Sequence, residues 1–327
     1  MNSEKVICPC RKVTKGDLIK AVEQGAESFK EVKKLTKVAS ACGKCKKEAK
    51  KITEGLLRER EEKEGLQKSK VSRQDGCACE GESVKRTVVI TGATDGIGRA
   101  LALLLAREYH LALCGRNENK MQELLRELEE TNPTGHFFGR CFDITKDEKR
   151  HEFCETVTAE FETVDIVVNN AGANTKKDRV TDIAPEDLRY MFELNCVSAL
   201  GIIQEFYPVM LRQKQQREHG KDHRNAGLFI NILSTCCLYH TPMTGSYSAT
   251  KHAMEALSKI LLKEVKNEGI GVCSVYPGGT DTNFRAASNP EYLRPETVAK
   301  MIKACMETEE GCIHDIVIRP PVEDNIP

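Results

Sequence analysis

The stretch V-V-I-T-G-A-T-D-G-I-G, residues 88–98, decides the fold of most of the chain. Its apolar start, Val88 to Ile90, predicts a buried strand. The residues Thr91 to Gly98 then turn into a helix that we expect to begin near Arg99. Three glycines in this turn let the backbone approach a pyrophosphate, and the helix N-terminus offers N–H donors to its negative charge. The stretch therefore predicts a strand, loop and helix that bind a dinucleotide.

Further apolar runs continue this alternation of strand and helix along the chain. The expected strands are Leu111 to Cys114, one ending at Cys141 to Ile144, Asp165 to Val168, Leu228 to Leu233, Val272 to Val275 and a closing edge strand, Ile316 to Ile318. This alternation predicts an α/β fold, a doubly wound parallel sheet with right-handed crossovers. Such sheets bind ligands at the carboxyl ends of their strands.

A candidate proton-transfer site follows the expected strand Leu228 to Leu233. Tyr247 and Lys251 are four residues apart, so on a helix their side chains share one face. An ammonium beside a tyrosine favours the phenolate and brings the hydroxyl closer to working pH as an acid or base. Ser234, thirteen residues before the tyrosine, presents a hydroxyl where the strand ends. A Tyr–Lys pair alone arises by chance on many helices, so the serine and the glycine pattern support the assignment.

The motifs T-G-x-x-x-G-I-G at 91–98 and N-N-A-G at 169–172, with Ser234, Tyr247 and Lys251, resemble the short-chain dehydrogenase/reductase family. The resemblance covers residues 84–327. It implies a Rossmann-type sheet, a nicotinamide cofactor, a small-molecule carbonyl or alcohol substrate, and a homo-oligomer. It also implies a catalytic role for Asn195, in E-L-N-C-V-S-A, whose backbone carbonyl binds a water that links the lysine to solvent. The alternative for Asn195 is a polar residue that bends a helix.

The same resemblance implies the cofactor-binding residues. Asn170 and Gly172 would support the central sheet and the cofactor, and Thr280 would hydrogen-bond the carboxamide. Asp143 would meet the adenine amino group; the alternative is a turn residue at a strand end. The full expected set is Gly92, Thr94, Asp95, Gly96, Ile97, Gly98, Arg116, Asp143, Asn170, Gly172, Tyr247, Lys251, Pro277, Gly278 and Thr280.

The residues after the second strand favour NADP(H) over NAD(H). Enzymes that select NAD often place an acid there for the ribose 2′-hydroxyl, whereas an arginine can pair with the 2′-phosphate of NADP. This chain has Gly115-Arg116-Asn117, so the acid is absent and an arginine is present. Asp95 argues the other way, because NADP enzymes of the family often carry a basic residue in the glycine loop.

The first fifty residues hold two closely spaced thiol pairs, Cys8-Pro9-Cys10 and Cys42-Gly43-Lys44-Cys45. Two such pairs can converge on one tetrathiolate site that suits an iron–sulfur cluster or structural zinc. The alternative is four unpaired thiols.

Between the thiol pairs the sequence predicts two short helices. Thr14 is expected to cap a helix from Lys15 toward Gln24, and Ser28 a second from Phe29 toward Thr36. Apolar residues at helical spacing would form a small core beneath the metal, and a third helix would start near Cys42.

The pattern C-P-C followed by C-G-K-C resembles the bacterioferritin-associated ferredoxin-like domain over residues 5–53. The resemblance implies a small all-α unit in which Cys8, Cys10, Cys42 and Cys45 hold a [2Fe-2S] cluster, with zinc as the alternative. The stretch V-A-S-A at 38–41 departs from the family because it lacks the usual glycines.

We therefore expect three parts: a metal-binding domain, 1–53; a charged linker, 54–83; and a dehydrogenase domain, 84–327. In the linker, Cys77 and Cys79 form either a stray thiol pair or a redox-active or metal-binding one.

Charge is unevenly distributed along the chain. The 327 residues contain 49 Lys/Arg and 49 Asp/Glu, yet residues 1–51 hold 14 Lys/Arg against 6 Asp/Glu. Because Phe29 is the single aromatic residue of this basic segment, a solvated face or an acidic redox protein partner is favoured over nucleic acid. No apolar run approaches the ~18 residues of a membrane span, and the N-terminus lacks an apolar signal core. We expect a cytoplasmic protein with no nucleic-acid or membrane partner, whose fifteen cysteines are thiols or metal ligands.

Two functions fit these motifs. In an NADP(H)-dependent carbonyl reductase or alcohol dehydrogenase, Tyr247 would transfer the proton, Ser234 would hydrogen-bond the substrate oxygen, and Lys251 would tune the phenol and hold the ribose. The alternative is a nucleotide-sensing or redox-partner docking protein with little catalysis, which would have no need for a proton relay. A [2Fe-2S] centre passes single electrons, hydride transfer moves two, and no flavin motif is seen. We therefore expect the cluster domain to be structural, sensing or docking.

Overall fold

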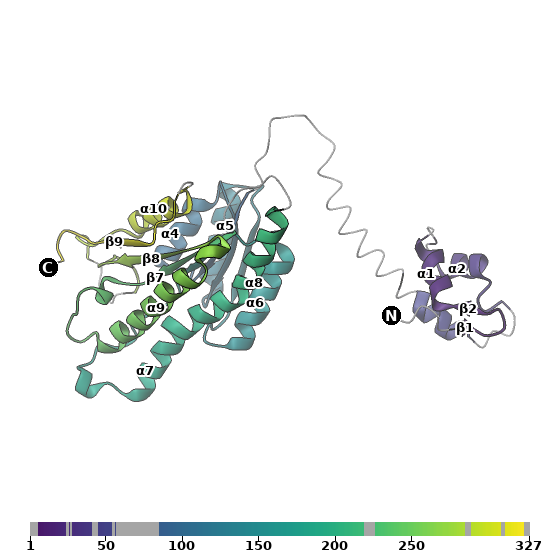
Figure 1. The fold of residues 1–327 in the computed structure, drawn as a ribbon, viewed down its shortest axis with the longest axis horizontal. Helices are drawn as coiled ribbons and strands as arrows, with labels where there is room; N and C mark the ends of the chain where they lie inside the picture. The colour runs from purple at the N-terminus through teal and green to yellow at the C-terminus, as the bar shows by residue number, and fades with distance from the viewer. Residues whose placement is uncertain are drawn as a thin grey trace, which may run out of the picture. The chain divides into compact units, whose positions relative to one another are not determined.

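The computed structural model describes residues 6–23, 26, 28–40, 45–53, 56, 85–218, 226–284, 289–308 and 311–323. The chain divides into two compact units, Met1–Glu82 and Ser83–Pro327 (Figure 1). The expectations for Cys42, Cys77 and Cys79 lie outside the described residues.

The larger unit is built on a seven-stranded sheet with the order β5-β4-β3-β6-β7-β8-β9. Each neighbouring pair is parallel. The strands are β3 (Thr87–Thr91), β4 (His110–Gly115), β5 (Phe137–Cys141), β6 (Ile166–Asn169), β7 (Gly227–Ile232), β8 (Ile270–Pro277) and β9 (Asp315–Ile318). The doubly wound parallel sheet is confirmed. Its strand order reverses at β3, between β4 and β6, which is where such sheets bind ligands.

Helices cover both faces of this sheet (Figure 1). One layer contains α4 (Gly96–Leu105), α5 (Glu118–Thr131) and α10 (Pro295–Met306), and the other contains α6 (Asp147–Glu160), α8 (Ser198–Glu218) and α9 (Gly245–Glu264). Alternate strand residues fill the two apolar cores. Val88 and Ile90 pack with the first layer, whereas Val89 packs with the second. The near-continuous apolar strands follow from burial on both faces.

One long helical run crosses the second layer. It consists of α7 (Pro185–Phe192), a π-helical turn (Glu193–Val197) and α8. By length and composition, Pro185–Gln215 is the one helix among the described residues that could span a membrane. Of its most apolar window, 56% is buried inside the protein, because the helix packs against α6 and α9 as a core element. Glu205 and Pro208 interrupt its apolar residues, so the sequence shows no continuous apolar run there.

Two boundaries near the glycine loop and the third strand differ from expectation. Helix α4 begins at Gly96 rather than near Arg99, because the extended Asp95 caps it and accepts a hydrogen bond from the Gly96 amide at 2.8 Å. Strand β5 ends at Cys141, so Asp143 and Ile144 belong to the following loop.

The smaller unit packs helices around a compact apolar core. Helix α1 spans Lys15–Glu23 and α2 spans Phe29–Thr36, and residues 46–53 are also helical. The capping predictions are confirmed. The Thr14 hydroxyl accepts from the Asp17 amide at 3.3 Å, and the Ser28 hydroxyl accepts from the Glu31 amide at 3.4 Å.

The smaller unit also contains strands that the purely helical expectation omitted. The strands β1 (Val6–Cys8) and β2 (Val13–Thr14) pair antiparallel. Segments of three and two residues are too short to show a periodic pattern in the sequence.

Candidate functional site

The glycine loop after β3 is packed tightly against the N-N-A-G turn after β6. A β-carbon on Gly98 would lie 2.4 Å from the Gly92 carbonyl oxygen, and one on Gly92, whose φ is +65°, would lie 2.9 Å from Ala171 Cα. The side-chain nitrogen of Asn170 donates to the carbonyls of Thr91 at 2.9 Å and Gly92 at 3.1 Å. Side chains are therefore excluded from the cradle at the α4 N-terminus, which fits a dinucleotide pyrophosphate.

A cavity of about 350 Å³ lies at the carboxyl ends of the strands, beside this cradle. Most of the expected site residues line it: Gly92, Asp95, Gly96, Ile97, Arg116, Asn170, Gly172, Ser234, Tyr247, Lys251, Pro277, Gly278 and Thr280. Thr94 lines an adjoining cavity of about 270 Å³. Gly98, Asp143 and Asn195 line neither of the two. The sheet thus gathers residues that lie far apart in the sequence around one space large enough for a small ligand.

Ser234, Tyr247 and Lys251 meet on one side of the larger cavity. Ser234 follows β7 and caps a 3-10 turn (Thr235–Cys237), where its hydroxyl accepts from the Cys236 amide at 3.2 Å. Tyr247 and Lys251 lie on α9, and the Lys251 ammonium is 5.8 Å from the centre of the tyrosine ring. Lys251 is 5% exposed and donates to the Ile232 carbonyl at 2.7 Å. Burial lowers the pKa of Lys251.

Asn195 lies behind the cavity, in the π-helical turn that joins α7 to α8. Its side-chain oxygen accepts from the Ala173 amide at 2.8 Å, and its side-chain nitrogen donates to the Ala173 carbonyl at 2.9 Å and the Thr250 hydroxyl at 3.1 Å. A β-carbon on Gly172 would lie 2.8 Å from the Asn195 side-chain oxygen and 3.5 Å from the Lys251 nitrogen. Asn195 therefore fixes the segment that faces the lysine. Single π-turns often occur at functional sites.

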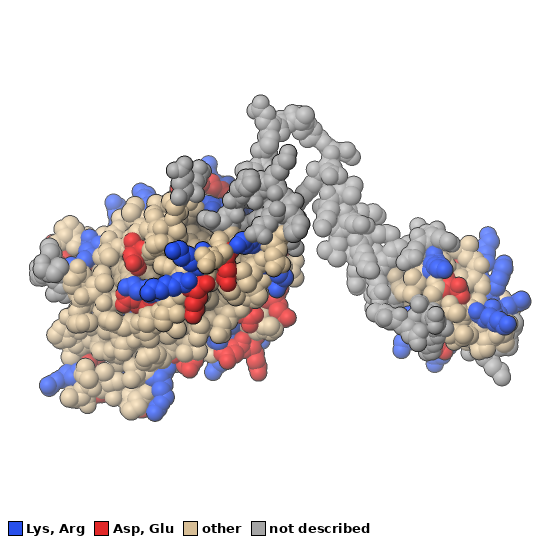
Figure 2. Space-filling model, viewed as in Figure 1, with Lys and Arg blue, Asp and Glu red and all other residues tan. Residues whose placement is uncertain are grey.

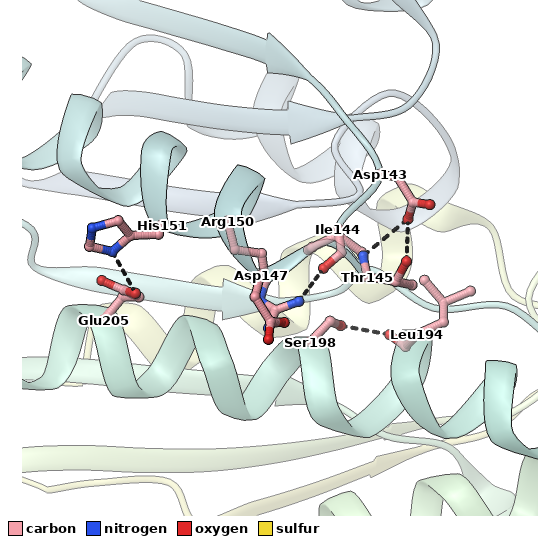
Figure 3. Close-up of polar contacts among 9 residues, drawn as sticks. All are labelled: Asp143, Ile144, Thr145, Asp147, Arg150, His151, Leu194, Ser198 and Glu205. Atoms are coloured by element: carbon pink, nitrogen blue, oxygen red, sulfur yellow. Dashed lines mark hydrogen bonds and ion pairs between the residues drawn. The ribbon is translucent and has the colours of Figure 1, made fainter.

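The loop after β5 shapes the smaller cavity (Figure 3). The Asp143 carboxylate accepts from the Thr145 amide at 3.0 Å and hydroxyl at 2.8 Å. Burial opposes ionisation of Asp143, but these bonds outweigh it and lower its pKa. Asp143 thus has the turn contacts of a strand-end residue, and its contact with adenine stays a prediction.

Three further contacts stabilise the walls of the smaller cavity (Figure 3). The buried Arg150 donates to the Ile144 carbonyl at 2.7 Å and forms an ion pair with Asp147. The Ser198 hydroxyl donates to the Leu194 carbonyl at 2.7 Å. Because Ile144 and Leu194 line the cavity, these bonds fix its apolar surface.

Sequence reasoning missed three residues at or beside these two cavities. Lys120, in the first turn of α5, forms an ion pair with Asp95, and Asn283 donates to both oxygens of Asp95 at 3.1 Å. Phe284 packs edge-on against Tyr247, with ring centres 5.7 Å apart. Lys120 could have been found from its position three residues after the helix-capping Asn117, which places it in the first turn of α5. Nothing in the sequence indicates that the loop at 281–284 reaches Asp95 and Tyr247.

In the smaller unit, Cys8 and Cys45 come together. Hydrogen bonds from the Ala39 amide, the Cys45 thiol and the amides of Arg11 and Cys10 lower the pKa of Cys8 despite burial, whereas burial raises that of Cys45. Backbone N–H donors around a buried sulfur suit a thiolate ligand. Cys10 is exposed. No group of three or more potential metal ligands forms within the described part of the chain, and that part excludes Cys42.

Family models match both units of the chain. The short chain dehydrogenase family model matches residues 86–293, and the BFD-like [2Fe-2S] binding domain model matches residues 6–54. The chain belongs to the short-chain dehydrogenase/reductase family and is an oxidoreductase of that type with an N-terminal BFD-like domain.

Relatives and solved structures agree with this assignment. An uncharacterized oxidoreductase of Staphylococcus aureus (strain USA300) is 31% identical over 244 residues, which is 72% of this chain and 97% of the relative. The NADPH-dependent pterin aldehyde reductase of Arabidopsis thaliana is 32% identical over 61% of this chain and 76% of that protein. An alcohol dehydrogenase from the archaeon Thermococcus sibiricus, complexed with 5-hydroxy-NADP, superimposes with a TM-score of 0.66 at 25% identity and covers 75% of this chain and 100% of that one.

Proposed function

We propose that the larger unit is an NADP(H)-dependent carbonyl reductase or alcohol dehydrogenase in which Ser234, Tyr247, Lys251 and Asn195 are catalytic. The main observation is that Ser234, Tyr247 and Lys251 line the same cavity as the glycine loop. Bound NADP(H) would supply or accept the hydride. A small carbonyl or alcohol beside it would then lie within reach of a hydroxyl pair and a buried cation.

Each side chain has one step in the proposed reaction. In the reducing direction, Tyr247 donates its hydroxyl proton to the substrate oxygen, and the Ser234 hydroxyl donates a hydrogen bond to that oxygen. Lys251, fixed through its bond to Ile232, faces the phenol and the ribose side of the cavity. Asn195 holds Ala173 in place through its side chain. Its backbone carbonyl would bind a water that links Lys251 to solvent, so that the phenolate of Tyr247 regains a proton.

The preference for NADP(H) over NAD(H) rests on charge. Arg116 lines both cavities, and the charge of Asp95 in the glycine loop is compensated by Lys120. The pterin aldehyde reductase is named as NADPH-dependent, and the archaeal dehydrogenase binds an NADP derivative, which is consistent with this preference.

For the smaller unit we propose a [2Fe-2S] cluster held by Cys8, Cys10, Cys42 and Cys45, within a domain of residues 1–53 joined by the linker 54–83 to the dehydrogenase domain 84–327. Among the charged side chains on the face of this unit seen in Figure 2, Lys and Arg predominate over Asp and Glu, which suits an acidic redox protein partner. The cluster would serve structure, sensing or docking, since one-electron and hydride chemistry do not couple without a mediator. A homo-oligomer is proposed by family resemblance.

The test is the variant Tyr247→Phe, assayed for NADPH oxidation against a panel of aldehydes and ketones. Loss of the proton donor should lower kcat by about 10²- to 10⁴-fold. The Kd for NADPH should stay near that of the unchanged protein, because the ring remains. Tyr207→Phe is the matched control, since that hydroxyl bonds Glu268, at 3.0 Å, and lines neither cavity.

Two results would contradict this function. If Tyr247→Phe keeps full turnover, the catalytic assignment is wrong. If the unchanged protein binds NADPH but reduces no carbonyl in the panel, the sensing or docking alternative is favoured.

A further inference from the structure

Residues 319–323, which follow β9, fold back onto the wall of the larger cavity, and we call this segment the clasp. Its two consecutive prolines cannot donate backbone hydrogen bonds, so they end the ladder of β9 and turn the chain. Pro320 is buried, and its carbonyl accepts from the Glu323 amide at 3.3 Å. The clasp therefore returns the Glu323 side chain to the turn that follows β8.

The Glu323 carboxylate binds the backbone of that turn. One of its oxygens accepts from the Gly279 amide, and a β-carbon on Gly278 would lie 2.5 Å from the other oxygen. The Gly278 amide donates to the Ile318 carbonyl at 2.8 Å. The absence of a side chain at Gly278 thus lets a carboxylate lie against the backbone. Because Gly278 and Thr280 line the larger cavity, the carboxylate holds one of its walls.

Arg319 binds this carboxylate and a second segment of the site. Its Nε donates to the Glu323 carboxylate at 3.0 Å, and a terminal nitrogen donates to the Glu323 carbonyl at 3.2 Å. The guanidinium also lies 4.3 Å from the centre of the Tyr239 ring, in the segment after Ser234. The arginine and glutamate side chains are 14% and 21% exposed, so solvent screens this pair less than an open surface pair. The clasp therefore joins two segments that border the cavity.

We propose that Glu323 and Arg319 are positioning residues of the dehydrogenase site, which hold the turn 278–280 in the conformation that receives the nicotinamide half of the dinucleotide. The inference rests on the proposed function, in which Ser234 and Tyr247, lining the same cavity as this turn, act on a substrate beside the nicotinamide. Without the clasp, the turn would have to be ordered when the cofactor binds, and that cost lowers affinity. The described lining of the smaller cavity includes no clasp residue, so an adenosine fragment should bind independently of the clasp.

The experiment measures Kd in the full chain for NADPH and for adenosine 2′,5′-bisphosphate, a fragment that lacks the nicotinamide half, by calorimetry. Glu323→Ala should raise the Kd for NADPH by about tenfold, the loss expected for one charge-assisted hydrogen bond, and leave the Kd for the fragment unchanged. Glu323→Gln keeps an oxygen for the Gly279 amide and should recover most of this loss. Arg319→Met leaves that bond in place and should raise the Kd for NADPH by about threefold.

Gly278→Ala tests the same contact from the other side. The new β-carbon would displace the carboxylate, and the φ of Gly278 is not positive, so the backbone accepts alanine. Gly278→Ala should therefore match Glu323→Ala, and the double variant should bind NADPH as well as either single one, because both changes break one contact. Glu307→Ala is the matched control, since Glu307 also pairs with a cation four residues earlier, Lys303 at 3.4 Å, and lines neither cavity. It should leave both Kd values unchanged.

Four results would count against these assignments. An unchanged Kd for NADPH in Glu323→Ala would overturn the inference and leave the proposed function standing. An equal rise in the Kd values for NADPH and the fragment would also overturn it, because a general loss of structure weakens both. A double variant much weaker than either single one would show that Gly278 and Glu323 act separately, and an unchanged Kd in Arg319→Met would overturn the role of Arg319. If the unchanged protein does not bind NADPH, the proposed function itself fails.

Discussion

The two units build their sites in opposite ways. In the dehydrogenase unit, residues from segments as distant as Gly92 and Thr280 meet because parallel strands end at one edge of a sheet with two apolar cores. In the smaller unit, Cys8 ends β1, Cys10 lies in the turn before β2, and Cys45 directly precedes the helical residues 46–53. The described residues of this unit form one core with ten buried apolar members. A core of that size supports a fold only weakly, and a metal usually completes such a unit. The dehydrogenase unit should therefore stay folded without a bound cofactor, whereas the smaller unit should need its metal centre to fold.

The largest expected effect comes from removing a thiolate from the smaller unit. Cys8→Ser should abolish the visible absorption of the proposed iron–sulfur cluster, because this buried sulfur receives the amide hydrogen bonds that stabilise a thiolate. The smaller unit should then lose its protection against hydrogen exchange, while carbonyl reduction by the larger unit is unchanged. Absorption spectra, exchange measured by mass spectrometry and NADPH oxidation report the three outcomes. Cys312→Ser, at an exposed thiol of the larger unit, is the control.

A chain that begins at Glu82 provides the converse comparison. It should fold, bind NADPH and turn over at the rate of the full chain, because it retains both apolar cores of the larger unit. A truncated chain that folds and binds NADPH but has lost turnover would show that the two units exchange electrons, and the contrast drawn above would be wrong.

The difference between the units also explains what the sequence could predict. Strand and helix patterns predict the parallel sheet, since apolar runs such as Val88 to Ile90 are long enough to be recognised. The spacing of the motifs predicted that Ser234 and Tyr247 share one site, and both line the same cavity. The Asp95–Lys120 pair and the contact of Phe284 with Tyr247 could not be predicted, because they depend on how loops meet in space. The short strands of the smaller unit could not be predicted either, because they contain too few residues to form a periodic pattern.

An intermediate effect is expected at a second thiol with a lowered pKa, this time in the dehydrogenase unit. Hydrogen bonds with Cys237, Ser234 and Ser248, and the charge of Lys251, outweigh burial and lower the pKa of Cys236 to about 6. Iodoacetamide should modify Cys236 at a rate that rises through pH 6 and levels off by pH 7, since the thiolate is the nucleophile. An ordinary thiol would rise through pH 8 to 9. Peptide mapping across pH measures the profile.

The neighbouring Cys237 serves as an internal control for this profile. It is buried, and its bond to Cys236 together with burial raises its pKa, so it should stay unmodified over the same range. Alkylation of Cys236 should abolish turnover, because the adduct lies beside the Ser234 hydroxyl, and Cys236→Ser should resist this inactivation. A midpoint near pH 8.5 would show that Cys236 behaves as an ordinary thiol and that its neighbours do not stabilise the thiolate.

The smallest expected effect concerns the backbone that holds the Cys8 thiolate. Ala39 has a φ of +54°, a left-handed conformation that costs an alanine about 1 kcal/mol more than a glycine, yet its amide is the foremost donor to Cys8. Ala39→Gly should therefore raise the free energy of unfolding of the smaller unit by about 0.5 kcal/mol, after the extra chain entropy of glycine is subtracted. Thermal loss of the proposed cluster's absorption measures this change. Ala21→Gly makes the same change in α1, where it should cost about 1 kcal/mol. Equal losses for both variants would show that the turn at Ala39 is not strained. A gain in stability confined to Ala39→Gly would show that the smaller unit stabilises its Cys8 thiolate with a strained backbone amide. In the dehydrogenase unit, side chains stabilise the Cys236 thiolate instead.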